Sequence, residues 1–386
     1  MTADGQPLVI YGDISLEYDF GPEHPLTPRR FGPSIDLLRT MGAEKFQAPR
    51  VATDDELSRL HTRDYIATVK SFADDPLGAS EAGIGPGDCP PFEGMHEASA
   101  AVAGGSIDAI DRILAGDVVH SFHPGGGLHH AMPGRASGFC IYNDVALAVA
   151  RARDYGHRVL YVDLDVHHGD GTQQMFWEDP QVLTFSIHET PLALFPGTGF
   201  TDEDGGDEAR GTAVNVPVQP YTGDESWLAA VKQVVPALAE AFRPTFLVSQ
   251  HGCDTHVFDP LAHLRLTTRA YLAATLMLDE IAHKYADGRW LATGGGGYDV
   301  YRVVPRSWSL VWLAQAHDDP PDAIDGAWSE RWANDAERFG QSPPPEHFVD
   351  PDNLVGREPN GVADANARTA DRALSGALEA LKEGSF

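Results

Sequence analysis

Short apolar runs alternate with longer stretches of helical periodicity over most of this chain. Runs rich in β-branched and aromatic residues predict strands at 8–11, 118–122, 158–162, 182–187, 246–249 and 290–293. Apolar residues at helical spacing predict helices at 97–114, 143–153, 226–242 and 267–284. Thr53 followed by Glu56 predicts a further helix start with a capping box. This alternation predicts an α/β fold with a central, mainly parallel sheet and helices on both faces.

Polar or glycine-rich clusters follow four of the predicted strands. They lie at 123–127, 163–171, 250–254 and 294–297. The ligands of such sheets gather at the carboxyl ends of the strands. We therefore expect one active-site crevice at that edge, built by four strands.

The cluster after the strand at 158–162 has the composition of a metal site. In an extended segment Asp163, Asp165 and His167 project to one side. Two close carboxylates repel each other unless a cation or a proton separates them. A catalytic zinc ion takes three protein ligands and keeps one open position. Asp165 and His167 supply two of them, and the spacing leaves the third open between Asp254 and Asp259.

Two further motifs offer groups for catalysis. His129 and His130 follow a glycine run, and carboxylates elsewhere in the crevice can orient their rings. Tyr298 follows the glycines at 294–297, which lack the Lys-Ser/Thr of a phosphate-binding loop. Tyr298 is either a packed aromatic residue or a hydroxyl donor to an oxyanion.

Composition narrows the classes of partner. Asp and Glu outnumber Lys and Arg by 57 to 28, which gives a net charge of −29. This charge argues against nucleic acid and anionic membranes as partners. It either attracts cationic partners or only keeps the protein soluble. No signal peptide and no apolar run of membrane-spanning length is visible. Three widely spaced cysteines suit a reducing compartment. We expect a cytoplasmic protein, and the sequence carries no signal for its oligomeric state.

The composition also changes along the chain. Beyond residue 314 the sequence becomes acidic and rich in proline, and a final helix is predicted at 365–382. We expect a single catalytic domain at 1–314 and a peripheral C-terminal extension at 315–386.

Five motifs give the chain a family resemblance. They are GGLHHAMPGRASGFCIYND at 126–144, VLYVDLDVHHGDGTQQMF at 159–176, FPGTG at 195–199, QHGCDTHVFDPLAHL at 250–264 and GGGGY at 294–298. In this order they resemble the zinc-dependent histone deacetylase superfamily, which has the arginase/deacetylase α/β fold. The segments EHPLTPRR at 23–30 and DPLAHL at 259–264 are most similar to the bacterial acetoin-utilisation branch. The resemblance implies removal of acetyl groups from protein lysines, with acetyl-CoA synthetase as the family's expected substrate.

The resemblance also implies roles for the catalytic residues. Zinc, or iron(II) in the cell, would be bound by Asp165, His167 and Asp259. The family usually has a small residue before the last of these, where this chain has Phe258. The resemblance further implies that His130, paired with Asp170, is the general base. It implies that His129, paired with Asp163, stays positive and helps to protonate the leaving group, and that Tyr298 stabilises the oxyanion.

The substrate and ion contacts are implied in the same way. The lysine stem would pass between Phe139 and Phe195, with the carbonyl of Gly138 as an acceptor and Asp88 holding the substrate backbone at the rim. A structural potassium ion would be bound by Asp163, Asp165, His167 and Ser186. Arg30 matches the arginine of an internal exit channel for acetate.

Three other functions compete with this interpretation. Acetylpolyamine hydrolysis uses the same chemistry, and the acidic surface suits a polyamine. A dimanganese ureohydrolase shares the fold but has an Asp-x-His-x-Asp order, whereas this chain has Asp163-x-Asp165-x-His167. A catalytically silent acetyl-lysine binding module would lack His130 or Tyr298, and both are present.

Overall fold

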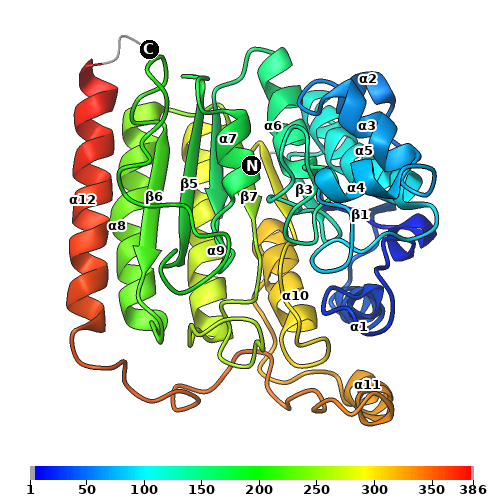
Figure 1. Ribbon diagram of the computed structural model, residues 1–386. Coiled ribbons are helices and arrows are strands. Elements are labelled where there is room, and N and C mark those ends of the chain that lie inside the picture. The colour runs from blue at the N-terminus through cyan, green and yellow to red at the C-terminus, as the bar shows by residue number, and fades with distance from the viewer. Residues whose placement is uncertain (1–4, 384–386) are drawn as a thin grey trace.

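The computed structural model describes residues 5–383. They fold around one eight-stranded sheet (Figure 1). The strand order is β2-β1-β3-β8-β7-β4-β5-β6, and every pair of neighbours is parallel. The strands are β1 (Leu8–Ile10), β2 (Phe46–Gln47), β3 (His120–His123), β4 (Val159–Asp163), β5 (Val182–Glu189), β6 (Ala213–Val218), β7 (Phe246–Gln250) and β8 (Trp290–Thr293). The prediction of a parallel α/β sheet is confirmed.

Helices cover both faces of the sheet, because successive strand residues point to opposite sides. Tyr161 of β4 packs in the cluster with α5 (Met95–Leu114) and α6 (Asp144–Asp154). Its neighbours Leu160 and Val162 belong to the cluster on the other face. That face is covered by α1 (Phe31–Thr40), α8 (Asp224–Phe242), α9 (Thr268–Tyr285) and α10 (Val304–Ala316). The shorter helices are α2 (Asp54–Leu57), α3 (Arg63–Lys70), α4 (Pro76–Glu81) and α7 (Asp170–Met175).

The strands that carry polar clusters are neighbours in the middle of the sheet. Their order is β3-β8-β7-β4, so the four loops that follow them open at the same edge. The sheet therefore brings all four predicted clusters together.

The two strands at the ends of the sheet, β2 and β6, were not predicted. β2 has only two residues, and β6 contains Pro217, which interrupts a strand pattern. Proline is tolerated in an edge strand, where its missing N–H does not break a ladder. The capping box was predicted correctly, since Thr53 accepts from the Glu56 N–H and Glu56 from the Thr53 N–H.

The C-terminal segment is integrated into the core more closely than a peripheral extension would be. Helix α11 (Gly326–Arg338) contacts α1, and α12 (Val362–Glu383) packs on α8 and on the edge strand β6 (Figure 1, left). Ala370, Ala373 and Ala377 of α12 belong to the main hydrophobic core. Burial of this apolar helix face makes the C-terminal helix part of the core packing. The domain boundary at residue 314 stays a prediction.

Two sequence expectations concern the whole chain. Among residues 5–383, no helix combines the length and the apolar character needed to cross a bilayer. The three cysteines Cys89, Cys140 and Cys253 are buried and unpaired. Burial raises the pKa of Cys89 to about 12, so this thiol stays protonated.

Candidate active site

The loop after β3 is anchored by a buried carboxylate. Asp144, the first residue of α6, accepts hydrogen bonds from the N–H groups of Gly127 (3.1 Å) and Leu128 (2.8 Å). Burial outweighs these bonds and raises the pKa of Asp144 to about 6. Gly127 has φ of 98°, and a Cβ here would lie 2.7 Å from the carbonyl oxygen of Gly294. The anchored glycine turn directs the next two residues, His129 and His130, into the crevice.

The structure brings both predicted histidine–aspartate pairs together. Nδ1 of His129 lies 2.7 Å from Oδ2 of Asp163, and Nδ1 of His130 lies 2.7 Å from Oδ1 of Asp170. All four side chains are buried. Tyr161 donates a further hydrogen bond of 2.6 Å to Asp163. Each imidazole is therefore held in one orientation, with Nε2 facing the crevice.

The two imidazoles differ in charge. Burial lowers the pKa of His129, but the carboxylates of Asp163 and Asp165 outweigh it and raise the pKa to about 9. Burial and the neighbouring His129 cation lower the pKa of His130 to about 4, despite the opposing effect of Asp170. At neutral pH His129 is positive and His130 is neutral.

Three side chains converge where a metal ion was predicted. The ligand atoms of Asp165, His167 and Asp254 all lie within 4.8 Å of one another. Nδ1 of His167 is 3.1 Å from Oδ1 of Asp165 and 3.1 Å from Oδ2 of Asp254. The remaining carboxylate oxygens are fixed: Oδ2 of Asp165 accepts from Gln250 at 2.7 Å, and Oδ1 of Asp254 accepts from the Val166 N–H at 3.0 Å.

Asp259 is not part of this group, so the geometry replaces it with Asp254 as the third candidate ligand. Both oxygens of Asp259 accept backbone hydrogen bonds, from Leu261 (3.0 Å) and from Tyr298 (2.9 Å). Both oxygens of the Asp259 carboxylate therefore fix the backbone around Tyr298 and Leu261. This is the physical reason for correcting the ligand set that the resemblance implied.

The electrostatics of the group suit a cation. Burial and the charge of Asp165 raise the pKa of Asp254 to about 6. Burial opposes the imidazolium form of His167, but hydrogen bonds to Asp165 and Asp254 raise its pKa to about 10. The buried carboxylates of Asp165 and Asp254 lie within 4.8 Å of each other and repel. A positive charge between them, from either a proton or a metal ion, offsets this repulsion. Two carboxylates and one imidazole are also ligands that zinc accepts, and they fit the predicted ion.

Aromatic side chains surround the approach to this group. Phe195 lies edge-on to His130 with ring centroids 5.0 Å apart, and Phe139 lies edge-on to Tyr298 at 6.0 Å. Burial raises the pKa of Tyr298 well above its usual range, so its hydroxyl stays a donor. Gly138 has φ of 52°, and a Cβ there would lie 2.4 Å from the ring of His130. This residue must be glycine, because a side chain would displace the imidazole.

Asp88 lies close to the wall of the same pocket, separated from it by His24. Its side chain is exposed, and its carbonyl oxygen is 3.3 Å from Nε2 of His24. The His24 ring packs edge-on against Phe139 with centroids 4.5 Å apart. Asp88 is thus next to the pocket wall and free to contact a ligand that enters from solvent.

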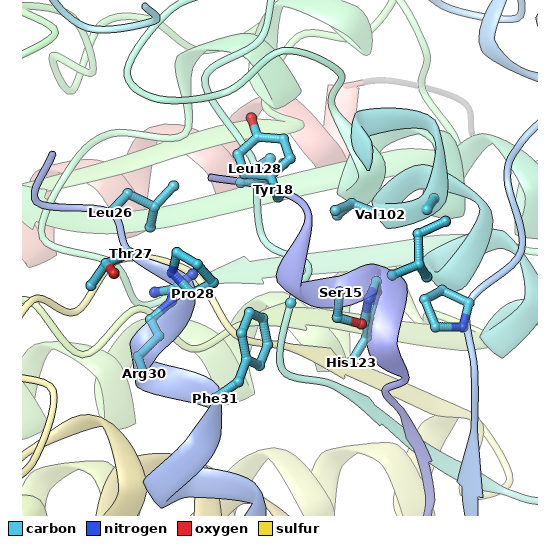
Figure 2. A pocket seen from close by; sticks show the side chains of 14 residues that line it. Ser15, Tyr18, Leu26, Thr27, Pro28, Arg30, Phe31, Val102, His123 and Leu128 are labelled. Atoms are coloured by element: carbon cyan, nitrogen blue, oxygen red, sulfur yellow. The ribbon is translucent and has the colours of Figure 1, made fainter. Parts of the chain in front are cut away.

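Arg30 lies on an internal cavity next to the pocket. Figure 2 shows this cavity with Arg30 and Pro28 on one side and Ser15 and His123 on the other. Leu128 lines both the cavity and the pocket. The Arg30 guanidinium is buried and donates a hydrogen bond of 2.7 Å to the carbonyl oxygen of Gly295. The predicted exit-channel residue therefore borders the site from the inside.

Ser186, the predicted potassium ligand, lies on β5 directly opposite Asp163 in the parallel pairing with β4. Its hydroxyl is 2.8 Å from Nδ1 of His188. The structure thus places Ser186 beside Asp163. The Ser186 hydroxyl is within hydrogen-bond distance of His188.

Two residues important for this geometry, Asp144 and Gln250, were given no role from the sequence, and a third, Asp254, was left open as an alternative ligand. Asp144 anchors the histidine loop, Gln250 holds Asp165, and Asp254 completes the candidate ion-binding group. One signal pointed to Asp254: the family's small residue before the metal aspartate is matched by Cys253, whereas Phe258 before Asp259 broke the pattern.

Comparison with known proteins agrees with this fold. Residues 24–315 match the histone deacetylase domain. The chain is 41% identical to the acetoin utilization protein AcuC of Bacillus subtilis over 377 residues, covering 95% of this chain and 96% of that protein. It is 38% identical over 375 residues to AcuC of Staphylococcus xylosus, covering 95% and 97%.

Solved structures show the same relationship. A crystal structure of a histone deacetylase homologue complexed with SAHA superposes with a TM-score of 0.82 at 28% identity, covering 96% of this chain and 100% of that one. A histone deacetylase homologue from Aquifex aeolicus gives a TM-score of 0.82 at 28% identity and covers 95% and 100%. The chain belongs to the histone deacetylase superfamily and is a hydrolytic deacetylase of the AcuC type.

Proposed function

We propose that this deacetylase hydrolyses the side-chain amide of acetyl-lysine in proteins, with a zinc-class ion held by Asp165, His167 and Asp254. The observation that carries the proposal is the convergence of this three-ligand group with two histidine–aspartate pairs in one pocket. An amide is a weak electrophile, and a bound ion would polarise its carbonyl and lower the pKa of the attacking water.

The protein's own side chains divide the proton transfers. His130 is neutral and, oriented by Asp170, accepts the proton of the attacking water through Nε2. His129 is positive and favours protonation of the departing amine. The hydroxyl of Tyr298 donates to the oxyanion, and the Asp259 carboxylate holds the backbone of Tyr298 in place. Asp259 is a positioning residue in this scheme.

The pocket walls suit a lysine side chain. The rings of Phe139 and Phe195 offer apolar faces to an aliphatic stem, and the carbonyl of Gly138 is an acceptor near its end. Asp88 at the rim accepts the backbone N–H groups of a peptide. We place the activity in the cytoplasm, on acetylated metabolic enzymes, with acetyl-CoA synthetase as the first protein to test. The AcuC name of the relatives supports a metabolic substrate.

A second ion and a product path complete the proposal. A structural potassium ion would be held by the carboxylates of Asp163 and Asp165, the carbonyl of His167 and the hydroxyl of Ser186. The pairing of Ser186 with Asp163 across two strands supports this assignment. Acetate would leave through the cavity beside Arg30, whose buried guanidinium suits an anion.

The test compares a peptide with a polyamine as substrate. Asp88→Asn keeps an acceptor oxygen for amide hydrogens but removes the charge that attracts an ammonium group, whereas Asp88→Ala removes both. We expect Asp88→Asn to retain more activity than Asp88→Ala on an acetyl-lysine peptide, as measured by kcat/KM. On acetylputrescine, we expect both variants to lose activity similarly.

The wild-type preference decides between the two substrate classes. We expect higher kcat/KM for the peptide. A tenfold or greater preference for acetylputrescine, about 1.4 kcal/mol in the transition state, would assign the protein to acetylpolyamine hydrolysis instead. A salt titration is the control, because attraction between Asp88 and a cationic substrate weakens as ionic strength rises.

A further inference from the structure

A second group of metal-ligating side chains lies away from the active site. Its members are His120, Asp279, His283 and His317. His120 begins β3, whereas the catalytic crevice lies at the carboxyl end of that strand. Asp279 and His283 are one turn apart near the end of α9, and His317 caps the end of α10. Residues far apart in sequence therefore meet at the amino-terminal edge of the sheet.

The separations between these side chains are close to those of ligands around one metal ion. Oδ1 of Asp279 is 3.7 Å from Nε2 of His120 and 3.5 Å from Nε2 of His283, and Oδ2 is 3.4 Å from Nε2 of His317. The Nε2 atoms of His283 and His317 are 3.2 Å apart. Ligands at about 2.0–2.1 Å from a tetrahedral zinc ion are separated by about 3.3–3.4 Å. The four separations above are close to this value, and one ligand atom from each of the four residues lies within 4.8 Å of the other three.

Two buried atoms that face this point have no hydrogen-bond partner. They are Nε2 of His120 and Oδ1 of Asp279. His120 is only 1% exposed, and its Nδ1 donates to the carbonyl oxygen of Gln315 at 2.9 Å. That bond places the ring hydrogen on Nδ1 and leaves a lone pair on Nε2, the form in which histidine binds metals. Leaving such buried atoms unpaired costs free energy, and a bound cation removes that cost.

We propose that His120, Asp279, His283 and His317 bind a second zinc-class ion. Three imidazoles and one carboxylate favour zinc, cobalt, nickel or copper over calcium or magnesium. Four protein ligands leave no open position, so the ion is structural and joins the start of β3 to the ends of α9 and α10. His283 and His317 are partly exposed, at 37% and 43%, which lets the ion enter from solvent.

The test counts metal ions in the full-length protein. The chelator-treated protein is titrated with zinc, and the bound metal per chain is measured together with the melting temperature. The double variant His283→Ala/His317→Ala is compared with wild type and with His347→Ala, which removes an exposed histidine elsewhere. We expect the double variant to bind one ion per chain fewer than the other two proteins. We also expect it to gain less in melting temperature on adding zinc.

Two results would overturn the proposal. One is equal zinc binding by the double variant and wild type, with matching circular dichroism spectra. The other is the absence of an anomalous zinc peak between the four side chains in zinc-soaked wild-type crystals, where a water molecule would take its place. The crystal experiment needs no variant, so the proposal stays testable even if the double variant fails to fold.

Discussion

Nε2 of His129 lies 3.0 Å from Nε2 of His130, and each ring is bound on its far side to its own carboxylate. Two imidazolium ions at this distance repel each other strongly, so only one ring is charged at neutral pH. Asp163 and Asp165 both face His129, which assigns the charge to that ring. The two adjacent histidines therefore carry different charges, and this difference supports the separate roles proposed for them.

The first prediction concerns this division of roles. His130→Ala removes the proton acceptor and should lower kcat by about 10²–10⁴-fold, the usual contribution of a general base. His129→Ala should lower kcat less, because it removes a supporting charge. Steady-state kinetics on an acetyl-lysine peptide, with circular dichroism to confirm folding, checks the order. A larger loss in His129→Ala would exchange the two roles.

The second prediction distinguishes Asp254 from Asp259. Asp254→Asn keeps an acceptor for the Val166 N–H but weakens ion binding, so it should lose one bound ion per chain and nearly all turnover. Asp259→Asn should keep the ion and lose turnover only, since Asp259 holds the Tyr298 backbone. Metal analysis of the two purified variants beside wild type gives the answer. If Asp259→Asn loses the ion and Asp254→Asn keeps it, Asp259 is the ligand and the assignment of Asp254 is wrong.

The third prediction concerns Tyr298. Tyr298→Phe removes the hydroxyl and keeps the ring that packs near Phe139. Turnover should fall by about 10²–10³-fold, the cost of losing one oxyanion donor, while bound metal and KM change little. The checks are kcat, KM and metal content of the same preparation. Unchanged kcat would make Tyr298 a packing residue.

The fourth prediction concerns the link between the C-terminal segment and the site. Asp350 is buried, pairs with Arg306 at 2.8 Å and is 2.9 Å from Nε2 of His256, two residues after Asp254. Burial raises the pKa of Asp350, but the His256 hydrogen bond and the Arg306 charge outweigh it and hold the pKa well below its usual range. Its ionised form therefore stabilises the folded state.

Asp350→Asn should lower the free energy of unfolding at pH 7 by about 3 kcal/mol, because Arg306 is left buried without a countercharge. The wild-type advantage is complete above about pH 4 and disappears as the pH falls through the lowered pKa of Asp350. Urea denaturation at pH 7 measures the first effect, and a series from pH 5 down to pH 3 measures the beginning of the second, as a wild-type advantage that shrinks with falling pH. The control is Asp352→Asn, which removes an exposed carboxylate paired with Arg269 and should change stability by less than about 1 kcal/mol. Equal effects of the two substitutions would contradict this account.

Much of the fold follows from the apolar pattern. Buried strands such as Trp290–Thr293 consist mostly of apolar residues or follow directly on apolar residues, and their bounds were predicted to within two residues. Edge strands are less regular, and Pro217 concealed β6. The packing of α12 on that edge depends on tertiary contacts that no local pattern encodes.

The site was predictable where a motif determines the pairing, as for His129 with Asp163. The choice between Asp254 and Asp259 depends on how a loop turns, and spacing does not reveal which carboxylate faces His167. The group around His120 was invisible in the sequence, because its members are up to 197 residues apart and belong to three elements.

Metal-dependent hydrolysis of acetyl-lysine is the central claim, and acetate release from an acetyl-lysine peptide by chelator-treated protein tests it most directly. We predict no acetate release without metal, full activity after zinc is added back to wild type, and no recovery in Asp254→Asn. Equal acetate release before and after chelation, with metal analysis confirming that the protein is metal-free, would contradict the account.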